Sequence, residues 1–203
     1  MKLDLILILM LMLIPLGIAS SGNESVNTTA GNLIAIDVSD PMAWNNKGEA
    51  LLSSGKYNDA LMAFDKAIEI NPNLSEAWNN KAAVFKVLEY YDEGLRAVEK
   101  AIELNPQYSE AWYNKGFFLS CPWYNNGGVK GGITHGKRKY EEAIEAYNTA
   151  IELNPQYADA WNNKGLDLLM QGRYNESLTA FDRVIEINPT FCSSLEQQRS
   201  SSR

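Results

Sequence analysis

The chain has 203 residues, of which 45% are hydrophobic, 21% charged and 10% aromatic. This apolar fraction is sufficient for a packed core, so the composition excludes a wholly disordered protein. A formal net charge of −7, a single histidine and two cysteines argue against a nucleic-acid-binding surface, a histidine-rich metal site and a disulfide framework.

Residues 1–19 have the pattern of a secretory signal peptide. Lys2 precedes an apolar run over residues 5–14, and the small residues Gly17 and Ala19 then mark a cleavage site expected after Ala19. The run is shorter than the roughly 20 apolar residues that span a membrane. We therefore predict an exported protein, secreted or at the cell surface. The alternative is a protein anchored in the membrane by residues 5–19.

A polar leader is expected over residues 20–40. Its apolar segment at 33–37 falls one repeat period before the end of a predicted helix, so it is a candidate N-terminal cap for the repeats described next. Four Asn-x-Ser/Thr triplets are candidate glycan acceptors in an exported chain. They begin at Asn23, Asn27, Asn73 and Asn175.

The body of the chain is an internal repeat of 34 residues. The tryptophans Trp44, Trp78, Trp112 and Trp161 recur at this spacing, with one interruption of 15 residues before the last of them. Prolines and tyrosines show the same period and the same interruption. They mark four units, at 41–74, 75–108, 109–157 and 158–191, with the insertion lying within 120–139.

Each unit carries two apolar stripes at helical spacing. The first holds the tryptophan and a glycine or alanine four residues later. The second begins near the tyrosine and ends at an Asn-Pro pair, because proline cannot continue a helix. The small residues are expected to receive a large side chain of the paired helix. They are Gly48, Ala82, Gly116 and Gly165.

These columns of Trp, Gly or Ala, Tyr, Ala and Pro resemble the tetratricopeptide repeat (TPR) family over residues 41–191, although Glu89 replaces the usual turn glycine. The resemblance implies an all-α fold, a right-handed α-solenoid of four helical hairpins with the insertion in the third repeat. Residues 192–203 are expected to form a short capping helix and a disordered tail.

The family implies a non-enzymatic scaffold without a cofactor, which binds an extended peptide or a partner protein in a concave groove. The alternative is a structural solenoid that associates with itself and has no specific ligand. Some members hold a terminal carboxylate with lysine and arginine in groove columns that lack both residues here. We therefore do not expect that kind of peptide clamp.

An asparagine two residues after each tryptophan is the main candidate for partner binding: Asn46, Asn80, Asn114 and Asn163. An amide both donates and accepts hydrogen bonds, so it suits the backbone of an extended peptide. The alternative, with equal weight, is that these amides bond between repeats. Tyr113 and Phe117 are candidates to anchor an apolar partner side chain. Their alternative is burial under the insertion.

The insertion is expected to be a solvated loop. A weak alternative is an enzymatic or carbohydrate-binding site around Trp123 and His135. The sequence has no recognisable catalytic constellation and no spacing of metal ligands, so neither catalytic nor metal-binding residues are assigned. Cys121 and Cys192 fall in different parts of the predicted stack, and their pairing is left open.

Overall fold

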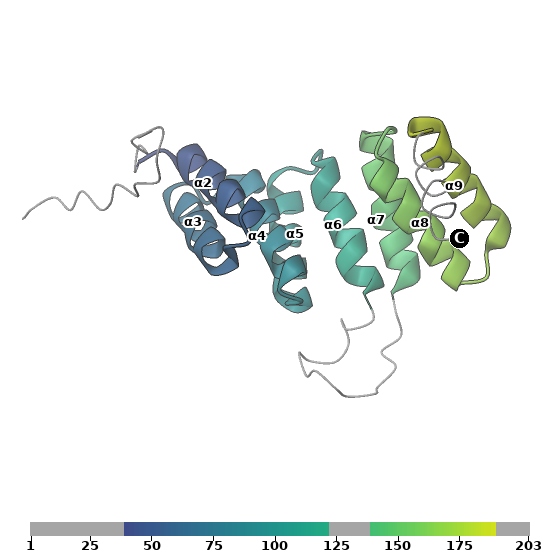
Figure 1. The fold of residues 1–203 in the computed structure, drawn as a ribbon, viewed down its shortest axis with the longest axis horizontal. Helices are drawn as coiled ribbons and strands as arrows, with labels where there is room; N and C mark the ends of the chain where they lie inside the picture. Colours follow the sequence, from purple (N-terminus) through teal and green to yellow (C-terminus); the bar gives the residue numbers. More distant parts are fainter. Residues whose placement is uncertain (1–38, 122–138, 190–203) are drawn as a thin grey trace, which may run out of the picture. The chain divides into compact units, whose positions relative to one another are not determined.

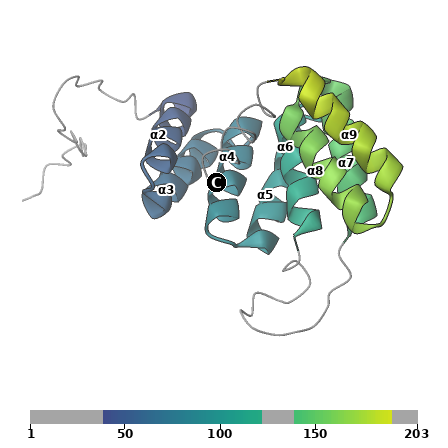
Figure 2. The ribbon, with the colours of Figure 1, turned by 45° about the vertical axis from the view of Figure 1, so that its right-hand side comes forward.

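The structure is a computed structural model that describes residues 39–121 and 139–189. All of them belong to one compact unit of the chain, Ile36–Arg203. The described residues form eight α-helices and no strand (Figures 1 and 2). The helices are α2 (Pro41–Ser53), α3 (Tyr57–Ile70), α4 (Ser75–Val87), α5 (Tyr91–Leu104), α6 (Ser109–Ser120), α7 (Tyr140–Leu153), α8 (Ala158–Met170) and α9 (Tyr174–Ile187).

Several predictions concern residues that lie outside these ranges. They are the signal peptide or anchor, the polar leader up to residue 38 with its cap, insertion residues 122–138, and the C-terminal cap and tail. Within the described ranges, no helix combines the length and the hydropathy needed to cross a membrane.

The helices pair as four hairpins: α2 with α3, α4 with α5, α6 with α7 and α8 with α9. Each second helix also packs against the first helix of the next hairpin. The first helices contact one another in succession, whereas the second helices of the described chain do not. The predicted all-α solenoid of four helical hairpins is therefore confirmed.

The repeated Asn, Pro and Trp form the corner between hairpins. Every second helix ends one residue before its Asn-Pro pair. The side chains of Asn71, Asn105 and Asn154 each accept a hydrogen bond from the backbone N–H two residues later, at 3.1, 3.1 and 3.2 Å. The carbonyl of each following proline accepts the indole N–H of the next tryptophan, at 3.0 Å for Trp78, 2.9 Å for Trp112 and 3.1 Å for Trp161.

Glu89 stands where the family usually has a turn glycine, and the turns inside the hairpins show the backbone conformation that it must adopt. Gly55 and Gly172 adopt left-handed backbone angles, with φ of 72° and 76°. Glu89 occupies the equivalent turn of the second hairpin and has φ of 62°. A side chain in this region is disfavoured. The second hairpin thus keeps the backbone of the repeat at some conformational cost.

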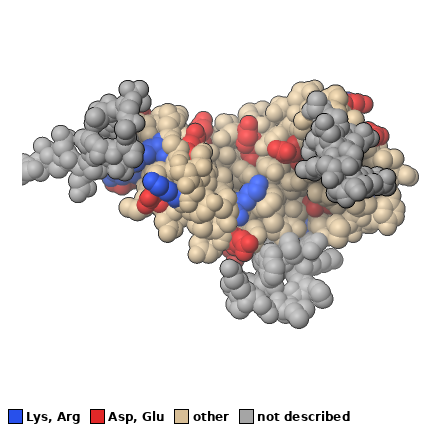
Figure 3. All heavy atoms as spheres, viewed as in Figure 1, with Lys and Arg blue, Asp and Glu red and all other residues tan. Residues whose placement is uncertain are grey.

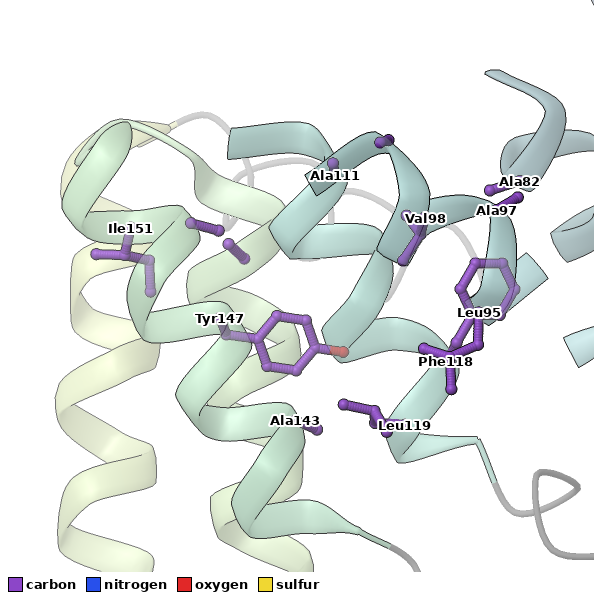
Figure 4. Close-up of a cluster of buried hydrophobic side chains, with 13 residues drawn as sticks. Ala82, Leu95, Ala97, Val98, Ala111, Phe118, Leu119, Ala143, Tyr147 and Ile151 are labelled. Carbon is purple, nitrogen blue, oxygen red and sulfur yellow. The ribbon is translucent and has the colours of Figure 1, made fainter. Parts of the chain in front are cut away.

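Knob-into-hole packing joins the helices as predicted. A Cβ added to Gly48 would lie 2.5 Å from the Phe64 ring, and one added to Gly116 would lie 2.5 Å from the Tyr147 ring. Figure 4 shows the Tyr147 ring reaching from α7 toward α6, beside Leu119. The largest core cluster runs from Ala82 on α4 to Ala160 on α8, so neighbouring hairpins share one core.

Candidate partner-binding face

Four positions of each first helix lie on one side of that helix, because they are separated by three, four and three residues. Since successive first helices are in contact, the four sets form one surface, which we call the first-helix face. It consists of Met42, Asn45, Glu49 and Leu52 on α2; Glu76, Asn79, Ala83 and Lys86 on α4; Glu110, Tyr113, Phe117 and Ser120 on α6; and Asp159, Asn162, Leu166 and Leu169 on α8.

A row of side-chain hydrogen bonds connects the hairpins along this face. Asn80 donates to the Asn45 Oδ1 at 3.0 Å. The next two bonds repeat the same step: Asn114 donates to Asn79 Oδ1 at 2.9 Å and Asn163 donates to the Tyr113 hydroxyl at 3.3 Å. We call these residues the amide row.

The amide row bears out the expectation that the asparagines bond between repeats, for Asn80, Asn114 and Asn163. Asn46 begins the column and is exposed on α2. Peptide binding by these four asparagines stays a prediction. Among the acceptors, Asn45 and Asn79 were not assigned a role from sequence, whereas Tyr113 was a candidate anchor for an apolar partner side chain. The signal for them was the recurrence of Asn or Tyr directly after each tryptophan.

We expect Asn114→Ala to lower the free energy of unfolding by about 1–3 kcal/mol, because it leaves a buried amide oxygen of Asn79 without its donor. Asn114 is 8% exposed and Asn79 is 5% exposed. Asn46→Ala is the matched control in the same column, and its exposed site predicts a change within about 0.5 kcal/mol. Urea unfolding followed by circular dichroism measures both. Equal losses in the two variants would contradict a structural role for the row.

Aromatic rings gather at the centre of the face. The Tyr113 ring lies 5.0 Å from the Tyr157 ring, centroid to centroid, and the Phe117 ring lies 5.8 Å from that of Phe118. Tyr113 and Phe117 are half-buried and pack against the core cluster. The structure therefore brings the two predicted aromatic anchors together.

Lys86 is a member of this aromatic centre that sequence reasoning missed. Its Nζ lies 4.0 Å from the Phe117 ring centroid and 5.1 Å from the Tyr113 ring centroid. Burial of the side chain lowers the pKa of the Lys86 ammonium, while the nearby charge of Asp159 acts to raise it. The ammonium thus exchanges part of its hydration for contact with the two rings.

Carboxylates of the first-helix face act on two tyrosines that directly precede α6 and α8. Burial raises the pKa of Tyr108 to about 12, and the charges of Glu110, Glu76 and Glu49 add to this effect. Burial likewise raises the pKa of Tyr157, with Glu110 and Asp159 among the further causes. The hydroxyls therefore stay protonated near neutral pH and can donate hydrogen bonds.

The ion pairs of the described residues leave these carboxylates unmatched. All nine pairs between described side chains use a carboxylate of a second helix. The lysines that directly follow the predicted asparagine column stand over tryptophan rings, with Lys47 Nζ 4.5 Å from the Trp44 centroid and Lys164 Nζ 4.9 Å from that of Trp161. Two lysines of the same column, Lys81 and Lys115, also pair with second-helix carboxylates. In the view of Figure 3, more acidic than basic side chains are visible along the surface.

The comparisons with known proteins agree with this architecture. Two family models described as "Tetratricopeptide repeat" match residues 41–74 and 158–191, and residues 63–92 and 97–145. A model described as "TPR repeat" matches residues 137–172. No curated protein sequence matches the chain.

Solved structures of TPR proteins share the fold. MamA from Desulfovibrio magneticus RS-1 is 24% identical, with a TM-score of 0.60 over 75% of this chain and 77% of that one. TTC0263, a thermophilic TPR protein of Thermus thermophilus, is 19% identical, with a TM-score of 0.62 over 73% and 75%. The first TPR of Spaghetti (RPAP3), bound to the HSP90 peptide SRMEEVD, is 22% identical, with a TM-score of 0.55 over 68% and 98%. The family models and the repeated hairpins together show that this chain belongs to the tetratricopeptide-repeat family.

Proposed function

We propose that the protein is a non-enzymatic interaction scaffold that binds an extended segment of another protein on the first-helix face. The observation that carries this proposal is apolar surface beside the amide row. Leu166 is 45% exposed and Leu169 is 43% exposed, and both lie on the same side of α8 as Asn162. Apolar side chains next to hydrogen-bonding groups suit a peptide that has both a backbone and apolar side chains to bind.

The arrangement of the helices supports the same face. The first helices contact one another in succession while the described second helices do not, so the first helices of all four hairpins line one continuous side. An extended segment that crosses this side would meet residues of several hairpins at once. With export directed by residues 1–19, the partner would be met outside the cytoplasm.

A peptide library displayed on phage tests the proposal. Peptides selected on the unaltered chain are measured by fluorescence anisotropy against the double variant Leu166→Ser, Leu169→Ser. We expect affinity to fall at least about tenfold, because two apolar contacts are lost. The matched control is Met62→Ser, Leu178→Ser, which removes apolar side chains that are 71% and 62% exposed on second helices. Peptides that bind both variants as well as the unaltered chain would refute the proposal.

The alternative, a self-associating structural solenoid, has one observation in its favour. Leu178 and Ile185 on α9 are 62% and 42% exposed. One period earlier, Ile144 and Ile151 on α7 are only 5% and 8% exposed, because α8 packs against α7. A molar mass that rises with protein concentration, and that Leu178→Ser abolishes, would favour this alternative.

A further inference from the structure

From the charges and ring contacts of the first-helix face, we infer that the bound segment is cationic and apolar, and that one of its Lys or Arg side chains replaces Lys86 over the Phe117 ring. This inference rests on the proposed function and adds the chemistry of the partner. The other Lys or Arg side chains of the bound segment would meet the carboxylates of the first-helix face. These are Glu49, Glu76, Glu110 and Asp159.

The first argument is the uneven distribution of ion pairs. In every ion pair between two residues of 39–121 and 139–189, the carboxylate lies on a second helix. The four carboxylates of the face take part in none of these pairs, and Lys86 is the one basic residue of the face. Four carboxylates against one ammonium attract a cationic segment and repel an anionic one.

The second argument is that the rings of Phe117 and Tyr113 already contact an ammonium group, that of Lys86. The Lys86 Nζ lies 4.0 Å from the Phe117 centroid and 5.1 Å from the Tyr113 centroid, within the range of a cation–π contact. The same rings would therefore accept a Lys or Arg side chain of a partner.

The third argument is the position of charge and apolar surface along each helix. Glu110 and Asp159 lie in the first turn of α6 and α8. Phe117 and Leu166 follow them seven residues later, about 10 Å along the helix axis. An extended peptide that crosses the helices directs alternate side chains to opposite sides. A peptide with alternating cationic and apolar residues therefore matches the face.

This chemistry differs from that of the peptide bound in the Spaghetti structure. That peptide, SRMEEVD, carries three carboxylate side chains and one arginine. On the first-helix face of the present chain, three carboxylates would meet like charges, which weakens association. We therefore expect this peptide to bind much more weakly than a cationic one.

Three labelled ten-residue peptides test the inference on the full chain: alternating Lys and Leu, alternating Glu and Leu, and alternating Lys and Ser. Fluorescence anisotropy should show the Lys/Leu peptide binding at least about tenfold more tightly than either of the others. Its affinity should fall as salt is raised from about 20 mM to about 500 mM, since salt screens exposed charges. Equal or tighter binding of the Glu/Leu peptide would overturn the inference.

Paired charge variants distinguish the effect of charges on the first-helix face from the effect of the net charge of the protein. Glu110→Gln, Asp159→Asn should weaken the Lys/Leu peptide at least about fivefold, because both charges lie on the face. Glu145→Gln, Glu152→Gln removes the same total charge from exposed positions of α7 and should change the affinity less than about twofold. Equal losses in both variants would show that only the net charge matters, against the inference.

Lys86→Met tests whether the partner replaces Lys86. The variant keeps an apolar stem and frees the ring faces, so the Lys/Leu peptide should bind about two- to fivefold more tightly. Unchanged or weaker binding would overturn the replacement of Lys86. If library peptides depend on Leu166 and Leu169 but are anionic or neutral, the proposed function stands and this inference fails. If no peptide depends on the face, both fail.

Discussion

Tyr147→Ala is expected to lower the free energy of unfolding by about 3–5 kcal/mol, the largest effect of any single substitution proposed for this protein. Tyr147 is 0% exposed and has the largest fully buried side chain of the residues that the structure describes. Its ring fills the space over Gly116 on α6 and lies 6.1 Å, centroid to centroid, from the ring of Tyr113. Removing the ring therefore opens a cavity between α6 and α7 that the surrounding helices fill only in part.

Tyr147→Phe is the control that keeps the ring. The lost hydroxyl lies 3.3 Å from the Ser120 Oγ, so we expect a loss of about 0.5–1.5 kcal/mol. Urea unfolding monitored by circular dichroism gives both values, and a shared m-value supports their comparison. If the alanine variant lost no more stability than the phenylalanine variant, the ring would not hold the hairpin together.

The helices and hairpins could be predicted from the sequence because each structural role recurs four times. The Asn-Pro pairs end the second helices, since proline removes a backbone donor and the asparagine side chain closes the turn. The small columns likewise predict a close approach of the paired helix. Gly94 on α5, by contrast, faces Phe118 of the next hairpin, which the spacing within one hairpin does not predict. A small residue in the sequence predicts a close contact with a large side chain, but it does not show which helix supplies that side chain.

The candidate site was only partly predictable, because the sequence does not show which residues of neighbouring helices come into contact. The asparagine column is visible in the sequence, but its partners lie one column away and one repeat earlier, at Asn45, Asn79 and Tyr113. Only the stacking of the first helices brings these residues together. The place of Lys86 over Phe117 depends on contact between α4 and α6, which no spacing within one helix encodes.

The unequal pairing of carboxylates also required the structure. Acidic residues occur on both kinds of helix, and their numbers alone do not distinguish the two surfaces. Many second-helix carboxylates have a Lys or Arg three residues away, as in Lys66 with Glu69 and Lys100 with Glu103. The carboxylates of the first-helix face have no such partner among the described ion pairs. The first-helix face thus keeps a negative charge that no ion pair between described residues neutralises.

Gly116→Val is expected to lower the free energy of unfolding by about 1–3 kcal/mol, because the added atoms overlap the Tyr147 ring. A Cβ at Gly116 would lie 2.5 Å from Tyr147 Cε1, and both residues are fully or almost fully buried. The ring belongs to a packed core and has little room to withdraw. Valine at an exposed helical site such as Ala50 on α2 gives the cost of the residue type alone, at most about 0.7 kcal/mol.

A double-mutant cycle tests whether the stability losses of Tyr147→Ala and Gly116→Val come from the same contact. In the Tyr147→Ala background the space over Gly116 is empty, so Gly116→Val should cost less than about 0.5 kcal/mol or restore some stability by filling the cavity. Urea unfolding measures the loss of unfolding free energy that Gly116→Val causes in the unaltered chain and in the Tyr147→Ala background. Additive losses would show that the two residues act independently. A coupling of at least about 1 kcal/mol would instead confirm that the large side chain of the second helix and the small residue of the first helix form one packing unit. Because Gly48 with Phe64 and Gly165 with Phe181 make the same contact, that unit is repeated along the stack and holds each first helix at the position from which it presents its part of the first-helix face.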